Sequence, residues 1–129
     1  MKTWGWTLLL LLYAVGIGYL SSRPLEVAQE AGVYHLDKLF HAVEFGLFLF
    51  LAWRATGKRL IAAWILTVAF AASDEVHQAF VPMRDASLFD VLADVLGATL
   101  VAGVLWRNAL LWRVLRTRIL ERKPQERGR

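Results

Sequence analysis

Ionisable and amide side chains gather beside three long apolar stretches of this sequence. They are Asp37, Lys38, His41 and Glu44 in the first stretch, Asp74, Glu75, His77 and Gln78 in the second, and Asp90 and Asp94 in the third. Carboxylates and imidazoles transfer protons and bind cations, so these residue types have the chemistry of a site. Because such groups are costly at the end of an apolar helix, we take them as candidate functional residues, with His41, Asp74 and Glu75 as candidate bases.

The densest of these groups follows Asp74. On a helix, His77 and Gln78 are three and four positions beyond Asp74, so the three side chains are expected to share one face. Pro82 has no amide hydrogen and disfavours helical backbone at the residue before it, which predicts a helix end near Val81.

The composition indicates a membrane protein. Hydrophobic residues make up 57% of the 129 residues, the mean hydropathy is +0.45, and there are six tryptophans, which is more apolar than a typical soluble domain. The absence of cysteine excludes a disulfide scaffold, cysteine-ligated zinc and a thiol nucleophile. The length allows one domain.

We predict an all-α, polytopic fold, with four transmembrane helices in a bundle joined by short loops. The predicted helices cover about residues 3–22, 37–55, 60–81 and 87–106, each long enough to cross a bilayer core of about 30 Å. A secretory signal peptide is the alternative for the first of them, and a short amphipathic connection is expected over residues 21–36. Residues 1–106 form the membrane domain, and residues 107–129 a basic cytoplasmic tail that begins as a juxtamembrane helix.

Lysine and arginine are distributed unevenly, and this predicts the orientation. If the amino terminus is inside, twelve cations lie inside and three outside. The inner ones are Lys2, Arg54, Lys58, Arg59 and the eight that follow Trp106; the outer ones are Arg23, Lys38 and Arg84. The positive-inside rule then places both termini of this multi-pass protein in the cytoplasm. All the candidate residues fall in the outer third of the bundle, so we expect an outward-facing acidic and histidine-containing pocket.

The order of these residues resembles that of a known family. The elements are Asp37-Lys38-x-x-His41, Asp74-Glu75-x-x-Gln78, Arg84, and Asp90-x-x-x-Asp94-x-x-Gly97. In this order on short hydrophobic helices they resemble the VanZ-like membrane proteins, over roughly residues 36–102. The resemblance implies a small bacterial membrane protein of a family whose founding member gives resistance to teicoplanin, a lipoglycopeptide that acts at the outer surface of the membrane. Glu44 stands where a more apolar or aromatic residue is expected.

Several of these residues also have structural interpretations. Asp37 could serve only as the N-cap of its helix, and Ser87-x-x-Asp90 matches a capping box with aspartate in place of glutamate. His77 could be a hydrogen-bonded histidine of the helix interface. Arg84 is either a surface cation or, as the more economical interpretation, the charge partner of a buried aspartate, Asp74 or Asp94.

The predicted pocket has an excess of acids. Six carboxyl groups (Asp37, Glu44, Asp74, Glu75, Asp90 and Asp94) face two fixed cations, Lys38 and Arg84, with His41 and His77 undecided. Mutual repulsion and desolvation both disfavour the charged forms of such groups. Three outcomes are open: some carboxyls are protonated and act as acids or bases, a divalent cation is bound, or a cationic part of a ligand fills the pocket.

Three classes of function follow from these outcomes. The first is an accessory protein that binds a lipid-linked envelope precursor or a glycopeptide-type amphiphile and alters antibiotic susceptibility. The second is an intramembrane hydrolase or transferase, for which the sequence holds no H-E-x-x-H, nucleophile elbow or cysteine. The third is a small proton-coupled transporter. Membrane lipid is the expected partner of the basic tail, no nucleic-acid module is present, and an oligomer is left open.

Overall fold

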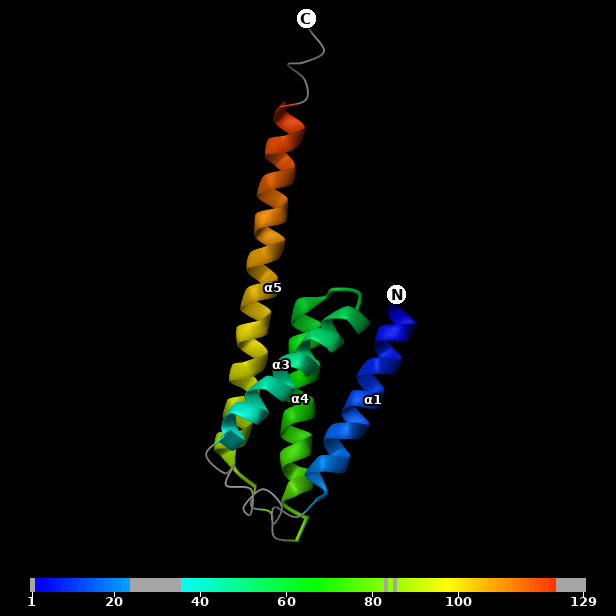
Figure 1. Ribbon diagram of the computed structural model, residues 1–129, viewed down its shortest axis with the longest axis vertical. Coiled ribbons are helices and arrows are strands. Elements are labelled where there is room, and N and C mark those ends of the chain that lie inside the picture. The colour runs from blue at the N-terminus through cyan, green and yellow to red at the C-terminus, as the bar shows by residue number, and fades with distance from the viewer. Residues whose placement is uncertain (1, 24–35, 83, 85, 123–129) are drawn as a thin grey trace, which may run out of the picture.

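The computed structural model describes residues 2–23, 36–82, 84 and 86–122, with side chains as far as residue 117. Within these residues the chain is all helical and contains no strand. The helices are α1 (Thr3–Ser21), α3 (Asp37–Ala55), α4 (Leu60–Gln78) and α5 (Leu88–Arg122), as Figure 1 shows. The short amphipathic piece that we predicted within residues 21–36 falls largely outside the described residues.

Two predicted helix ends differ from the structure. α4 ends at Gln78, three residues before Val81, because the next amides turn back to nearer carbonyls: Phe80 N donates to His77 O and Val81 N to Gln78 O, at 3.0 Å each. α5 does not end at Trp106 but continues to Arg122 as one helix of 35 residues. The stretch beyond Trp106 contains no glycine or proline before Pro124, so nothing in the backbone interrupts the helix there.

α3 is the central helix of the described bundle, and it contacts each of the other three. Figure 1 shows α3 crossing between α1 on one side and α5 on the other. The closest crossing lies between α3 and α5, where a Cβ atom at Gly97 would stand 1.9 Å from the carbonyl oxygen of Ala42. The pair Ala93 and Gly97, which the sequence offers as a small-xxx-small motif, therefore includes the residue that permits this approach.

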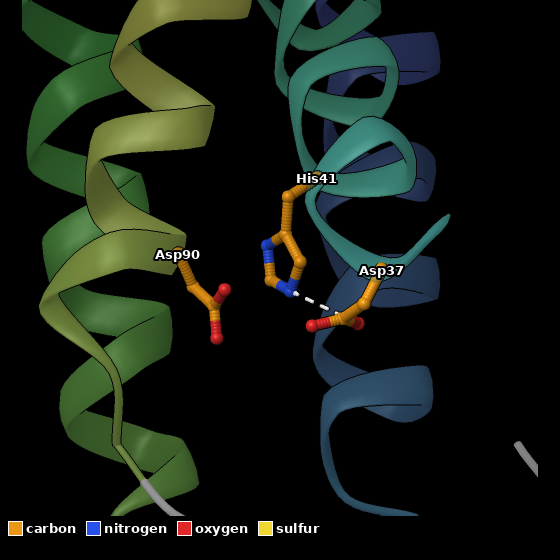
Figure 2. Close-up of side chains that lie close together, drawn as sticks. All are labelled: Asp37, His41 and Asp90. Carbon is orange, nitrogen blue, oxygen red and sulfur yellow. Dashed lines mark ion pairs between the residues drawn. The ribbon is translucent and has the colours of Figure 1, made fainter. Parts of the chain in front are cut away.

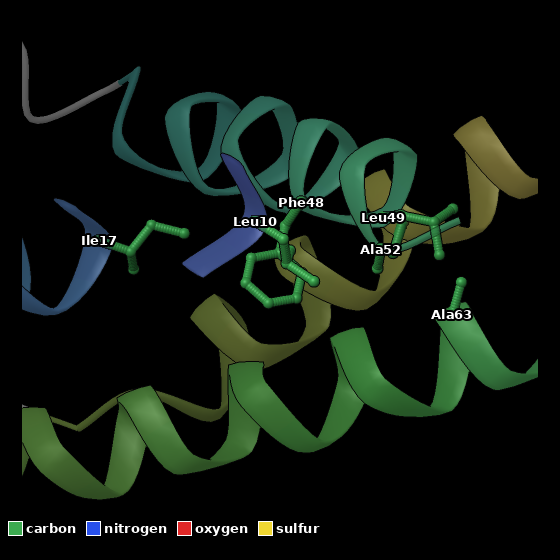
Figure 3. Packing of buried hydrophobic residues seen from close by; sticks show 7 residues of the cluster. Leu10, Ile17, Phe48, Leu49, Ala52 and Ala63 are labelled. Atoms are coloured by element: carbon green, nitrogen blue, oxygen red, sulfur yellow. The ribbon is translucent and has the colours of Figure 1, made fainter. Parts of the chain in front are cut away.

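The buried apolar cluster joins all four helices. It consists of Leu10, Ile17, Phe48, Leu49, Ala52, Ala63 and Ala98 (Figure 3). Phe48 stacks on Phe70 with ring centroids 4.5 Å apart and planes 10° apart, which ties α3 to α4. Large apolar side chains on the outer faces are exposed, as at Leu12 and Ile61, a pattern that is typical of helices covered by lipid.

Three of the described helices are long and apolar enough to cross a membrane: Thr3–Ser21, Leu60–Gln78, and Leu88–Thr117 within α5. α3 has the same length as α1, 19 residues. It carries four charged residues, however: Asp37, Lys38, Glu44 and Arg54. The described chain is therefore an all-helical protein with three membrane-compatible helices and a more polar fourth helix packed among them.

Candidate functional site

The polar residues meet at one end of the bundle. The ends of α1 and α4 lie beside the starts of α3 and α5 there, at the bottom of Figure 1. Two groups of contacts form at this end. We call the first the histidine cluster (Asp37, Lys38, His41, Asp90 and Asp94) and the second the Asp74 cluster (Ser21, Asp74, Gln78 and Arg84).

His41 is held in the histidine cluster by a carboxylate from another helix. Its Nδ1 lies 3.0 Å from Oδ1 of Asp94 on α5, and the residues are 8% and 2% exposed. An ionised carboxylate only accepts hydrogen bonds, so Nδ1 is the donor of this pair when Asp94 is ionised. The other ring nitrogen, Nε2, points toward Asp37, whose Oδ1 is 3.9 Å away (Figure 2).

Lys38 joins the two remaining carboxylates of this cluster. Its Nζ contacts Asp90 and lies 3.3 Å from Oδ2 of Asp37. Both structural alternatives for these aspartates are therefore wrong. The N-cap residue of α3 is Leu36, and no side chain caps that helix; Asp90 forms an ion pair with Lys38 rather than a capping box with Ser87.

The Asp74 cluster connects α4 to the end of α1. Oδ2 of Asp74 accepts a hydrogen bond from the Ser21 hydroxyl at 2.7 Å and another from Nε2 of Gln78 at 2.9 Å. Asp74 is 7% exposed, and Gln78 and Ser21 are also buried. A buried carboxylate is stable only when its oxygens are hydrogen-bonded, so these contacts explain how an apolar helix tolerates Asp74.

Arg84 does not pair with either buried aspartate, so the interpretation that favoured an ion pair with Asp74 or Asp94 is wrong. Its guanidinium donates instead to Oε1 of Gln78 at 3.3 Å, to the carbonyl of Arg23 at 3.0 Å and to the carbonyl of Leu20 at 3.2 Å. The guanidinium of Arg84 therefore joins Gln78 of α4 to the backbone at and just beyond the end of α1.

We expect Arg84→Lys to lower the free energy of unfolding by about 1–2 kcal/mol, because an ammonium cannot reach these separate acceptors as a planar fork does. The measurement is thermal unfolding of the purified protein in detergent. Arg113→Lys, in the exposed part of α5, is the matched control and should leave Tm unchanged. Equal Tm values for the two variants would contradict the contact.

Glu75 and His77 lie outside both clusters. Glu75 is buried, and its Oε1 accepts the backbone N–H of Ser87, which holds the connection that leads into α5. His77 is exposed, and its Nε2 lies 2.9 Å from the hydroxyl of Ser22. Asp74 and His77 contact the adjacent residues Ser21 and Ser22, and Gln78 bonds Asp74, so all three lie on the face of α4 toward the end of α1, with His77 at its exposed edge.

An open cleft of about 370 Å³ lies at this end, between α1, α3 and the end of α4. Its polar lining comes from Ser21, Asp37, His41, Glu44, Gln78 and Arg84. Glu44 differs from the other acids, since no hydrogen bond or ion pair to its carboxyl occurs within the described part of the chain. Its backbone carbonyl accepts the hydroxyl of Tyr13 at 3.2 Å. Glu44 therefore belongs to the lining of the cleft.

Sequence reasoning missed the contribution of α1. Ser21 and Tyr13 line the cleft, yet the first helix reads as a plain apolar span. The two adjacent hydroxyls at its end, Ser21 and Ser22, were the available signal, because hydroxyls at the end of a membrane helix find partners on neighbouring helices.

A cation could be held where three ligand atoms approach one another. One atom each of Asp37, His41 and Asp90 lies within 4.8 Å of the others. The cleft thus combines proton-accepting groups, a candidate cation site and a carboxyl with no protein partner.

The comparison with protein families found a match over most of the chain. A family model described as VanZ/LLP1 matches residues 4–113, which include all four helices as far as the exposed part of α5. No curated protein and no solved structure matched the chain. Since the match covers most of the chain and all the residues of both clusters, the protein belongs to the VanZ/LLP1 family.

Proposed function

We propose that this VanZ-like protein crosses the bacterial cytoplasmic membrane four times, with both termini in the cytoplasm. Three helices have the length and hydropathy of membrane spans. α3 supports a fourth span, because it is equally long and its buried residues pack against the other three helices. Its charges lie at its ends, apart from Glu44, which borders the cleft.

The opposite end of the bundle supports this orientation. A second cavity of about 650 Å³ there is lined by Trp53 and Trp106 together with Lys58, Arg59 and Arg113. Tryptophan is typical of the membrane interface, and lysine and arginine are typical of the cytoplasmic side. With this end at the cytoplasm, the cleft and both clusters face outward.

The second half of α5 fits a basic helix at the cytoplasmic surface. The 35 residues of α5 span about 52 Å at about 1.5 Å per residue, well beyond a bilayer core of about 30 Å. Every residue from 106 to 117 is exposed, including Leu110, Leu111 and Trp112. Because α5 is one continuous helix, this part projects beyond the bilayer core on the cytoplasmic side, where its arginines attract anionic lipid.

The outward cleft, in this proposal, binds the polar head group of an envelope component, such as a lipid-linked precursor or a lipoglycopeptide amphiphile, and thereby changes antibiotic susceptibility. The carboxyl of Glu44 carries the proposal, because it borders the cleft without a protein partner. A carboxylate in that position favours a cationic or hydroxyl-bearing group of a ligand. The aromatic rings of Tyr13 and Phe40 line the same cleft and offer an apolar wall to such a ligand.

We expect Glu44→Gln to abolish most of the protection that the protein gives a susceptible host against teicoplanin, measured as the minimum inhibitory concentration. The amide has the same shape but no charge, and no described contact of the fold depends on the carboxyl. Glu121→Gln, the same change at the far end of α5, is the matched control and should protect as the wild type does. Full protection by Glu44→Gln at equal protein level would contradict the proposal.

The two alternatives have less support. The His41–Asp94 pair resembles a base with its orienting carboxylate, as a hydrolase or transferase would need, but no described serine lies in a recognised nucleophile arrangement. A proton-coupled transporter needs a path through the bundle, whereas the described ionisable contacts of the cleft gather at one end.

A further inference from the structure

Asp37, His41 and Asp90 converge on one small volume. Figure 2 shows the imidazole of His41 between the two carboxylates, one from its own helix α3 and the other from α5. One ligand atom of each residue lies within 4.8 Å of the other two. Two ligands of zinc, each about 2.1 Å from the ion, stand at most about 4.2 Å apart. Small side-chain rotations would therefore bring all three atoms into coordination distance.

The contacts of His41 leave its Nε2 atom available to a ligand in this volume. The residue is 8% exposed, and its Nε2 makes no hydrogen bond within the described residues, since the oxygen of Asp37 is 3.9 Å away. When a neutral His41 donates from Nδ1 to the carboxylate of Asp94, 3.0 Å away, its Nε2 presents a lone pair toward Asp37 and Asp90. Metal-binding histidines characteristically donate their other ring N–H to a carboxylate, which orients the ring and raises its basicity.

We propose that Asp37, His41 and Asp90 bind a first-row divalent cation, zinc or manganese, with Asp94 as the positioning residue behind His41. An imidazole together with two carboxylates suits these ions better than magnesium or calcium, which prefer oxygen ligands alone. A doubly charged ion also offsets the two carboxylates, which otherwise share the single ammonium of Lys38. Asp37 and His41 also line the cleft that holds Glu44, but Glu44 is not among the three cation ligands, so the two proposals can be tested separately.

Lys38 is the competitor of the cation. Its ammonium contacts the same carboxylates, Asp37 and Asp90, that would coordinate the ion. Its side chain is 51% exposed, so it can turn toward water when a cation binds. Removing Lys38 should therefore tighten cation binding, whereas a purely structural ion pair predicts no such gain.

The test uses the full chain, purified through a tag without histidine and reconstituted in nanodiscs. The protein is incubated with zinc or with manganese, the free metal is removed, and the bound metal is counted by mass spectrometry. Competition with a chromogenic chelator then gives Kd for zinc. We expect one ion per chain in the wild type, loss of that ion in Asp90→Asn and His41→Gln, and about 10–100-fold weaker binding in Asp94→Asn. Lys38→Met should bind more tightly than the wild type.

His77→Gln is the matched histidine control, because His77 is exposed at the same end of the bundle but faces Ser22. It should retain the ion with wild-type affinity. Size-exclusion chromatography and circular dichroism identify any variant that fails to fold, and Lys38→Met tests the site by a gain that misfolding cannot produce. The proposal is overturned if the wild type binds neither metal, if His41→Gln binds as the wild type does, or if Lys38→Met shows no gain. Glu44→Gln should retain the ion, so a failure of head-group binding is distinguishable from a failure of the metal site.

Discussion

Gly97→Ala is expected to destabilise the protein by about 3 kcal/mol, the upper part of the range for an overpacked interface. The added Cβ would lie 1.9 Å from the carbonyl oxygen of Ala42, 2.5 Å from its carbonyl carbon and 2.6 Å from its Cα. These are backbone atoms, which cannot rotate away as a flexible side chain can. α3 and α5 must therefore separate at a point that adjoins His41 on one helix and lies three residues from Asp94 on the other.

The measurement is thermal or denaturant unfolding in detergent, with two further glycines as an internal series. A Cβ at Gly103, also in α5, meets nothing within 4 Å, so Gly103→Ala should be neutral or stabilising because alanine is the better helix former. A Cβ at Gly46 would lie 3.1 Å from the side chain of Val101, and Gly46→Ala should fall between the other two. A Gly97→Ala protein as stable as Gly103→Ala would refute the close crossing.

The second large effect concerns the buried His41–Asp94 pair. Asp94→Leu is expected to lower the free energy of unfolding by about 3 kcal/mol, because it leaves Nδ1 of His41 buried without an acceptor. His41→Leu should cost a similar amount, since it leaves a carboxylate unpaired in a site that is 2% exposed. The double variant should cost clearly less than the sum of the two, because neither partner is then left unsatisfied.

A double-mutant cycle on unfolding free energies measures this coupling. Asp94→Asn provides the conservative comparison, since the amide oxygen can still accept from Nδ1, and its loss should be the smallest of the single variants. Additive effects of Asp94→Leu and His41→Leu would show that the two side chains do not interact in the folded protein.

Hydrophobic length was sufficient to predict the helices but not all their ends. The uncharged runs and the charges that flank them predict α1 and α3 to within one residue. The boundary at Trp106 came from the thickness of a bilayer, with a separate juxtamembrane helix predicted after it; the structure has a single continuous helix there, because no glycine or proline intervenes. The predicted end of α4 at Val81 was late, since the effect of Pro82 reaches back through a turn.

The gathering of the polar residues at one end of the bundle was easier to predict from the sequence than the contacts between their side chains. Spacing along a helix shows which residues share a face, but it does not give the rotation of that face relative to neighbouring helices. The pairing of His41 with Asp94 depends on the crossing at Gly97, which the spacing of residues along either helix does not reveal. Arg84 was assigned by charge to an aspartate, whereas the side chain of Gln78 and the carbonyls of Leu20 and Arg23 are its acceptors.

The exposed part of α5, residues 106–117, has a consequence for the behaviour of the protein when it is removed from lipid. From residue 106 to residue 117 every side chain is exposed, so tertiary packing contributes little to the order of that segment. Isolated helices of this length are marginal in water. We therefore expect contact with anionic lipid to stabilise the helical form of this segment. Helical content should therefore fall when vesicles of anionic phospholipid are exchanged for an uncharged detergent, while the end of α5 that carries Asp90 and Asp94 keeps its structure.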